Sequence, residues 1–236
     1  MYSYPLSSRI LLAIDCIIFG FDGKDIKLLL IKRNFEPELG KWSLMGGFLK
    51  EEEDLEAGAS RILYDLTGLK DIYVEQLEVF GKVNRDPAER TVSVVFFALI
   101  QIEEHDAEAV RSHNASWISL DKRPQLIFDH EQMVMRAIEH LRYKAALHPI
   151  GFELLPEYFS IPQLQKLYEA IYNTPLDRRN FSRKLLSTGL LIDTGHKNSN
   201  STTKKATLYK LDTVRYKEKF HAFWNFMPDS MKPAQS

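Results

Sequence analysis

Residues 47–69, GFLKEEEDLEAGASRILYDLTGL, combine a glycine, a run of carboxylates and an arginine in a pattern that favours phosphate chemistry on a helix. Apolar side chains recur at helical spacing and predict a helix over 54–66, and Gly68 is typical of a helix end. Two positions where such chemistry needs acids hold Ile62 and Leu66 instead. The stretch therefore belongs either to an enzyme or to an enzyme's scaffold put to another use.

The same stretch resembles the Nudix box, whose pattern is G-x5-E-x7-R-E-U-x-E-E-x-G-U, where U is a bulky apolar residue. Ile62, Asp65 and Leu66 replace the three clustered glutamates of that pattern. The resemblance implies an α+β fold whose first part is a Nudix-like α/β/α sandwich with a mixed sheet. The positions that fit the pattern at the right spacing are Gly47, Glu53, Arg61, Leu63, Gly68 and Leu69.

The three departures remove ligands that a Nudix hydrolase uses to hold divalent metals, which neutralise a diphosphate and activate water. Ile62 and Leu66 offer no oxygen atom, and Asp65 is one methylene shorter than glutamate. Glu51, Glu52 and Glu53 could hold a stray cation, but they are interpreted as a solvated acidic loop at the start of the helix. We therefore expect no metal site, no cofactor and no useful catalysis, any hydrolysis being residual or metal-independent.

Length and composition indicate a soluble globular protein of two modest domains, or of one domain with an appended module. The chain has 236 residues, 44% of them apolar and 27% charged, which is ordinary for that class. Its single cysteine, Cys16, excludes a disulfide framework and favours a reducing compartment, so the cytoplasm is predicted. The apolar run 10–19 is too short to span a bilayer and is interrupted by Asp15, so it is interpreted as a buried strand without a membrane role.

Breakers near 148–151 predict a boundary between a domain at 1–149 and another at 150–236. The first has β-rich segments at 10–19, 26–33 and 91–100 and an amphipathic helix over 130–147. The second holds 13 Lys and Arg against 8 Asp and Glu, a balance of +5. The first domain then has 18 Lys and Arg against 24 Asp and Glu, a balance of −6. On charge, the second domain is therefore the likelier of the two to bind a polyanion.

Residues 160–189 predict two helices joined by a short turn. Ser160 and Gln163 stand at capping-box spacing before the first helix, and Asp177 is a good N-cap for a second helix that ends at Gly189. Two short strands, at 190–193 and 207–211, follow around a polar, basic loop. This order of elements predicts a winged helix-turn-helix.

The second helix carries arginine and amide side chains at i,i+4 spacing, a pattern suited to reading guanine and adenine in a major groove. An ordinary charged helix face is the alternative interpretation, and the basic loop beside it favours DNA binding by supplying phosphate contacts. The residues predicted to contact DNA are Arg178, Arg179, Asn180, Arg183 and Lys184 on the helix, and Lys197, Lys204 and Lys205 in the loop.

Over nearly its full length the chain resembles the Nudix-related transcriptional regulators of the NrtR and AraR groups. The segments that carry this resemblance are VEQLEVFGKVNRDP at 74–87, TVSVVFFALI at 91–100, LIFDHEQM at 126–133 and LDRRNFSRKLL at 176–186. The resemblance implies a non-catalytic sensor domain, a homodimer, and a double-stranded DNA operator that is bound or released according to a small ligand.

The two groups differ in effector, because the NrtR group responds to ADP-ribose and the AraR group to L-arabinose. Overall resemblance favours L-arabinose here, and the acidic first domain supports it by disfavouring a diphosphate; ADP-ribose is the alternative. Polar residues among apolar segments are the predicted effector contacts, whereas His130 is interpreted as a helix start. These contacts are Asp15, Lys32, Arg33, Trp42, Lys82 and Asp86. A Nudix hydrolase with an accessory domain and a regulator that also hydrolyses slowly are the competing functions.

Overall fold

The computed structural model describes residues 10–102, 108, 110–147, 154–197 and 206–218. The chain divides into two compact units, one comprising residues 1–20 and 27–137 and the other residues 21–26 and 138–236. The division falls inside a helix, so the domain boundary expected at 149–150 stays a prediction. No helix in the described ranges is both long and apolar enough to cross a membrane.

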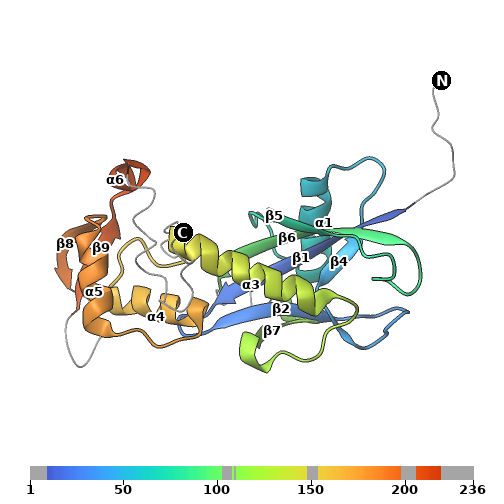
Figure 1. The fold of residues 1–236 in the computed structure, drawn as a ribbon, viewed down its shortest axis with the longest axis horizontal. Helices are drawn as coiled ribbons and strands as arrows, with labels where there is room; N and C mark the ends of the chain where they lie inside the picture. Colours follow the sequence, from blue (N-terminus) through green and yellow to red (C-terminus); the bar gives the residue numbers. More distant parts are fainter. Residues whose placement is uncertain (1–9, 103–107, 109, 148–153, 198–205, 219–236) are drawn as a thin grey trace, which may run out of the picture. The chain divides into compact units, whose positions relative to one another are not determined.

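The first unit is built on one seven-stranded sheet (Figure 1). Its central path runs β3-β2-β1-β6-β5, while β4 pairs antiparallel with β1 and β7 pairs antiparallel with β2. The sequence predicted the three longest strands, but the four others are short or half-exposed and lack a strong apolar run. The strands are β1 (Leu11–Phe21), β2 (Ile26–Lys32), β3 (Trp42–Ser43), β4 (Met45–Phe48), β5 (Glu75–Phe80), β6 (Thr91–Gln101) and β7 (Ala115–Ser119).

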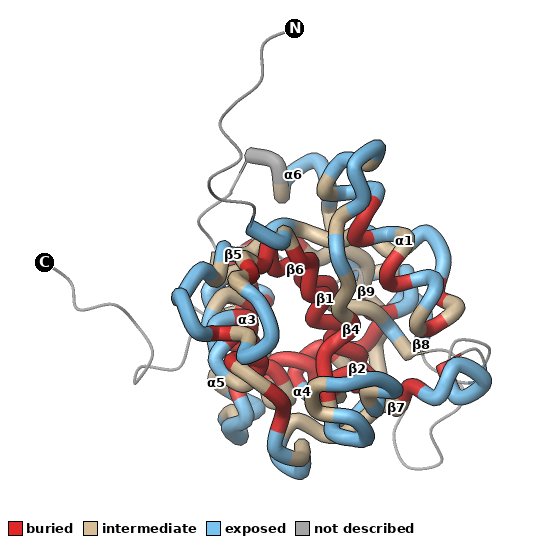
Figure 2. The backbone as a smooth tube through the Cα atoms, turned by 90° about the vertical axis from the view of Figure 1, so that its right-hand side faces the viewer, coloured by how far each residue is buried: buried red, intermediate tan, exposed pale blue. Residues whose placement is uncertain are grey.

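The central strand β1 is buried on both faces from Ala13 to Phe21, as its nearly unbroken apolar run predicts (Figure 2). Successive side chains of a strand point to opposite faces. Ile14, Cys16 and Ile18 pack in one core cluster with helix α1 (Leu55–Thr67). The intervening Asp15 instead faces the start of helix α3 (His130–Leu147). The two helices therefore cover opposite faces of β1, which confirms the layered α+β fold predicted for this part of the chain.

Helix α1 forms as its sequence predicts. Asp54 is its N-cap residue, and Gly68 ends it in the left-handed conformation, with φ of 73° and its N–H donated to the Tyr64 carbonyl. Ile62 is 2% exposed and packs so closely on β4 that a side chain at Gly47 would meet it at 3.1 Å. The aliphatic residues that replace acids on this helix thus serve the core.

Glu53 is not part of a solvated loop, which corrects the interpretation made from sequence. Its carboxylate accepts two hydrogen bonds from Arg61 and one from the backbone N–H of Lys50. Arg61 also donates to the Phe48 carbonyl at 3.1 Å. This clamp, meaning Glu53 with Arg61, ties the loop between β4 and α1 to the helix. Hydrogen bonding from Arg61 lowers the pKa of the Glu53 carboxyl to about 2.

The second unit has the winged helix-turn-helix order that the sequence predicted. Ser160 and Gln163 form the expected capping box at the start of helix α4, and the Asp177 side chain accepts the Asn180 N–H at the start of helix α5. Tyr168 of α4 packs on Phe181 of α5 with ring centroids 5.7 Å apart. The elements are α4 (Ile161–Tyr172), α5 (Arg178–Ser187), the paired strands β8 (Leu191–Lys197) and β9 (Thr207–Leu211), and α6 (Thr213–Glu218).

The clamp predicts a pH-dependent loss of stability in Glu53→Gln. Because the folded-state pKa is depressed to about 2, the charged carboxylate stabilises the fold above the unfolded pKa of about 4.3, and this contribution is lost as the pH falls toward 2. Urea midpoints should therefore be lower for Glu53→Gln than for wild type at pH 7, with a gap that narrows below about pH 5. Glu52→Gln is the matched control, and a gap that is constant with pH or equal for both variants would contradict the clamp.

Candidate functional site

A pocket of about 130 Å³ opens between strand β1, the end of β2, strand β4 and the start of α3. Every residue that lines it belongs to the first unit. Its lining combines acids, cations, two glycines and three phenylalanine rings, so it offers contacts for a polar ligand with a flat or apolar portion. It is lined by Ala13, Asp15, Ile31, Lys32, Arg33, Asn34, Phe35, Ser43, Leu44, Gly46, Gly47, Phe48, Leu66, Arg85, Asp86, Thr91, Phe128 and His130.

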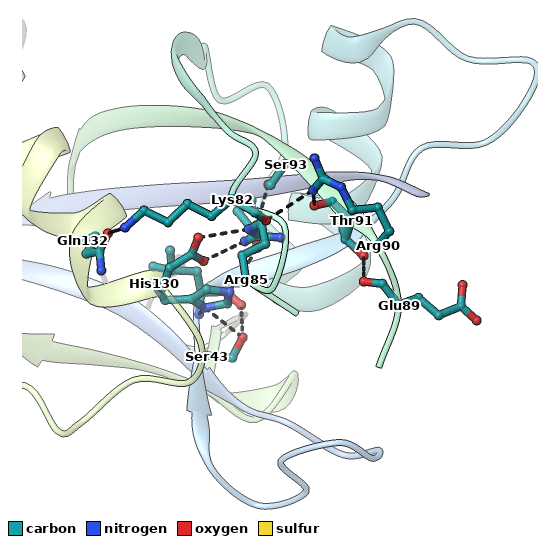
Figure 3. A network of polar contacts seen from close by, with 12 residues as sticks. Ser43, Lys82, Arg85, Glu89, Arg90, Thr91, Ser93, His130 and Gln132 are labelled. Atoms are coloured by element: carbon teal, nitrogen blue, oxygen red, sulfur yellow. Dashed lines mark hydrogen bonds and ion pairs between the residues drawn. The ribbon is translucent and has the colours of Figure 1, made fainter. Parts of the chain in front are cut away.

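Hydrogen bonds and ion pairs join four buried side chains at the floor of this pocket (Figure 3). Asp15 and Arg85 line the pocket, and Asp129 and Ser93 hold these two in place from outside the lining. Arg85 binds Asp129 through two parallel hydrogen bonds, of 3.0 Å from Nε and 2.8 Å from Nη2. The same Nη2 lies 3.5 Å from Asp15 Oδ2, which also accepts the Ser93 hydroxyl at 2.6 Å. An unpaired carboxylate inside an apolar strand would be costly, and Asp15 has two partners there.

His130 is the fifth member of the floor, and its neutral form is fixed by its surroundings. The Leu44 backbone N–H donates to Nδ1 at 3.2 Å, so the remaining ring proton resides on Nε2. Burial lowers the pKa of His130, against the raising effect of Asp15 and Asp129, so the ring is neutral at physiological pH. Nε2 lies 3.7 Å from Asp15 Oδ1. The residue begins α3, as predicted, and also lines the pocket.

The glycine pair of β4 leaves room for this arrangement. Gly46 stands opposite Asp15 in the antiparallel pairing of β1 and β4, and a Cβ at this position would collide with Asp15 Oδ1. Gly47 and Leu66 complete the adjacent wall. Leu66, which stands where the Nudix pattern has a glutamate, thus presents an aliphatic surface to the pocket.

Cations and aromatic rings surround the mouth. The Arg33 guanidinium lies 3.8 Å from the ring centroid of Phe35 and 5.6 Å from that of Phe128. Phe35 is 53% exposed, which places it at the outer edge. Burial lowers the pKa of Arg33, with Asp86 and Asp15 opposing the shift, and an arginine stays charged at neutral pH. Lys32 lines the pocket beside it. The mouth can therefore receive an anion.

Four of the six predicted effector contacts come together in this pocket, and two lie outside its lining. The four that line it are Asp15, Lys32, Arg33 and Asp86. Trp42 instead lies under the Lys32 ammonium, 5.2 Å from its ring centroid, and Lys82 donates to Gln132 at 3.3 Å (Figure 3). Sequence reasoning missed Arg85 and Ser93 as members of the site. A buried carboxylate at position 15 required partners, but it did not indicate which residues they are.

The box residues do not fit a divalent metal site. Glu53, the one box glutamate that remains, is engaged by Arg61 and the Lys50 N–H, and Asp65 is exposed on α1 with Arg61 as its ionic neighbour at 3.9 Å. Among the residues that the structure describes, no three His, Cys, Asp or Glu side chains are grouped to hold a metal ion. Hard cations need several oxygen ligands at short distances, and this helix does not gather them.

Helix α5 presents the side chains predicted to contact DNA. Phe181 and Leu185 are buried and fix the inward face of the helix, whereas Arg178, Arg179 and Arg183 are exposed, and Asn180 and Lys184 are half-buried. Arg183 Nη2 donates to Asn180 Oδ1 at 2.9 Å, which holds these two side chains together. Lys197 is exposed at the end of β8, while Lys204 and Lys205 lie outside the described residues. The helix and the end of the wing strand thus carry cations on their solvent side.

Comparison with known proteins agrees with this architecture. Residues 9–137 match the model of the NUDIX domain, and residues 151–211 match the NrtR DNA-binding winged helix domain. The ADPR responsive transcriptional repressor NtrR of Acinetobacter baylyi is 31% identical over 188 residues, which are 78% of this chain and 75% of that protein.

Two crystal structures from Shewanella oneidensis are also similar. NrtR in complex with a 27mer DNA is 31% identical, with a TM-score of 0.70 over 90% of this chain and 96% of that one. The NUDIX domain of the same protein in complex with ADP ribose is 32% identical, with a TM-score of 0.53 over 59% of this chain and 94% of that one. The chain therefore belongs to the NrtR-type family of transcriptional regulators, in which a Nudix domain is followed by a DNA-binding winged helix.

Proposed function

We propose that this protein is a transcriptional repressor that binds operator DNA through its winged helix and releases it when ADP-ribose enters the Nudix-domain pocket. The observation that carries the proposal is a pocket with a cationic mouth and a polar floor in the same chain as a helix that presents exposed arginines. A relative that responds to ADPR and a relative's NUDIX domain complexed with ADP ribose support this effector.

This effector replaces the L-arabinose predicted from the sequence, for which the relatives give no support. The prediction rested on overall resemblance to the AraR group, with the net negative charge of the first domain as its physical support. A ligand responds to the charges close to it rather than to the sum over a domain, since exposed charges further than about 10 Å away are screened at moderate salt. Lys32 and Arg33 both line the pocket, so a diphosphate meets cations at the mouth.

We further propose that the Nudix domain binds its ligand without useful hydrolysis. The clamp occupies Glu53, and Leu66 contributes an apolar surface where a metal ligand would be required. A bound diphosphate would then be neutralised by side-chain cations and would persist as a ligand. Persistence suits a sensor, because the ligand's concentration and not its turnover sets the occupancy of the pocket.

For the DNA-binding unit we propose that α5 enters the major groove and that the loop between β8 and β9 follows the phosphates. Exposed arginines spaced four residues apart on α5 suit bidentate contact with guanine, and a half-buried Asn180 beside them suits adenine. Winged helices commonly pair to read two half-sites, so the working form is proposed to be a homodimer on a roughly palindromic operator in the cytoplasm.

Calorimetric titration of the full chain tests the effector. ADP-ribose should bind, L-arabinose should give no binding heat, and Arg33→Ala should weaken ADP-ribose binding by about 1.5–3 kcal/mol, as expected for a lost hydrogen bond to a charged group. Arg111→Ala, which removes an exposed arginine outside the pocket, is the matched control. A binding heat with L-arabinose alone would show that the effector is the sugar and not ADP-ribose.

Incubation of the protein with ADP-ribose and Mg²⁺ tests the non-catalytic proposal. Chromatography should detect no AMP above the level in buffer, because the box lacks the acids that would gather the metal. Glu53→Gln distinguishes the box from a contaminant, since turnover that arises from the box would fall in this variant. Many turnovers per protein that stop with EDTA and with Glu53→Gln would favour the hydrolase instead.

Substitutions on α5 and the wing should differ in their effects on DNA affinity, measured by fluorescence anisotropy at one stated salt concentration. Arg179→Ala and Arg183→Ala should each cost about 1–3 kcal/mol on operator DNA and much less on random DNA, if each arginine reads a guanine. Lys204→Ala and Lys205→Ala should weaken both DNAs evenly. Lys166→Ala, on the exposed side of α4, is the control. If the α5 variants kept the wild-type preference for operator over random DNA, α5 would not be the element that recognises the operator sequence.

A further inference from the structure

We propose that Asp15 and His130 form a hydroxyl-binding subsite for the terminal ribose of the ligand. One hydroxyl accepts the Nε2–H of His130 and donates its own proton to Asp15 Oδ1. This assignment rests on the proposed function, because it names the part of ADP-ribose that the floor of the same pocket recognises.

The donor and the acceptor of this subsite lie too far apart to bond to each other. His130 Nε2 and Asp15 Oδ1 are 3.7 Å apart, beyond hydrogen-bond length, although both residues are buried and both line the pocket. A donor and an acceptor at this separation can each reach a third atom lying between and above them. A hydroxyl group satisfies both at once, because its oxygen accepts one hydrogen bond while its proton makes another.

Each of the two side chains is already held at its other end. The Leu44 N–H occupies Nδ1 of His130 and thereby leaves a donor at Nε2. Ser93 and Arg85 both engage Oδ2 of Asp15, so Oδ1 is the oxygen left toward His130. Arg85 is anchored in turn by its paired hydrogen bonds to Asp129. The donor and acceptor are therefore fixed in direction before a ligand arrives, which reduces the entropic cost of binding.

The positions of the mouth and the floor determine which end of the ligand meets the subsite. Arg33 and the half-exposed ring of Phe35 lie at the mouth, where a nucleobase can stack and phosphates can meet cations, whereas Asp15 is 4% exposed on the floor. The adenosine ribose is bonded to the base and stays with it. The terminal ribose lies across the diphosphate from the base, so it is the sugar that reaches the floor.

A subsite of this kind selects for the hydroxyl it binds. A ligand that lacks the terminal ribose leaves a buried donor and a buried carboxylate oxygen without the partner they were positioned for, which is how polar sites reject truncated analogues. ADP should therefore bind more weakly than ADP-ribose to this protein. The difference should depend on His130, because its Nε2–H is one of the two groups that the terminal ribose engages.

Titration calorimetry of the full-length wild type and of His130→Asn, each with ADP-ribose and with ADP, tests the subsite. The asparagine amide oxygen can still accept the Leu44 N–H, but the donor at the position of Nε2 is gone. ADP-ribose affinity should fall roughly 10- to 100-fold, the size expected for a lost hydrogen bond to a charged network, while ADP affinity stays within about 2-fold. His113→Asn, at an exposed histidine outside the pocket, should change neither.

The outcomes separate the subsite from the proposed effector. A wild type that does not bind ADP-ribose would overturn both. A wild type that binds ADP-ribose, together with a variant that loses both ligands equally or loses neither, would overturn the subsite alone. If His130→Asn loses its native circular dichroism, Ser93→Ala replaces it, because this variant frees the Asp15 carboxylate to turn, and a loss confined to ADP-ribose is again the supporting result.

Discussion

The burial of one carboxylate, Asp15, in the middle of the central strand is the constraint on which the rest of the site depends. A charged group inside an apolar strand is costly unless it is paired and hydrogen-bonded, and removing one partner of such a buried pair typically costs about 3–5 kcal/mol. Three residues accommodate this carboxylate. Arg85 and Ser93 bind its Oδ2, and the glycine at position 46 leaves space for its Oδ1. The same carboxylate faces the histidine with which α3 begins.

The Nudix-like box keeps the residues that shape the helix and its loop, but not the acids that would bind a metal. The clamp between Glu53 and Arg61 still fastens the loop to α1, and Gly47 still allows Ile62 to approach β4 closely. These contacts explain why the positions that shape the helix can match the Nudix pattern while the metal-binding positions do not. A fold of this type does not carry its activity with it, since activity depends on particular side chains in the site. The pocket beside the box has cations at its mouth, which suits the ligand binding proposed for it.

The sequence predicted local features well and long-range contacts poorly. Capping residues such as Ser160 and Asp177 act on the helices that begin next to them, so their effects could be predicted directly from the sequence. The need for a partner at Asp15 followed from its apolar neighbours, but Arg85 lies 70 positions further along the chain and nothing in its own surroundings marks it as that partner. The prediction of Trp42 as an effector contact failed for a similar reason. Its nearness to the glycine pair in sequence did not determine where its ring points, and the ring lies outside the pocket lining.

The effector prediction followed an overall resemblance that the relatives do not support, and the net charge that favoured it counts side chains without locating them. We propose above all that ligand binding in the Nudix domain weakens operator binding by the winged helix of the same chain. The most direct test is the affinity of the purified full-length protein for DNA upstream of its own gene, measured at fixed salt while ADP-ribose is titrated, with L-arabinose in parallel. The account predicts that DNA affinity falls as ADP-ribose saturates and is unchanged by L-arabinose. Specific DNA binding that does not respond to ADP-ribose would contradict it.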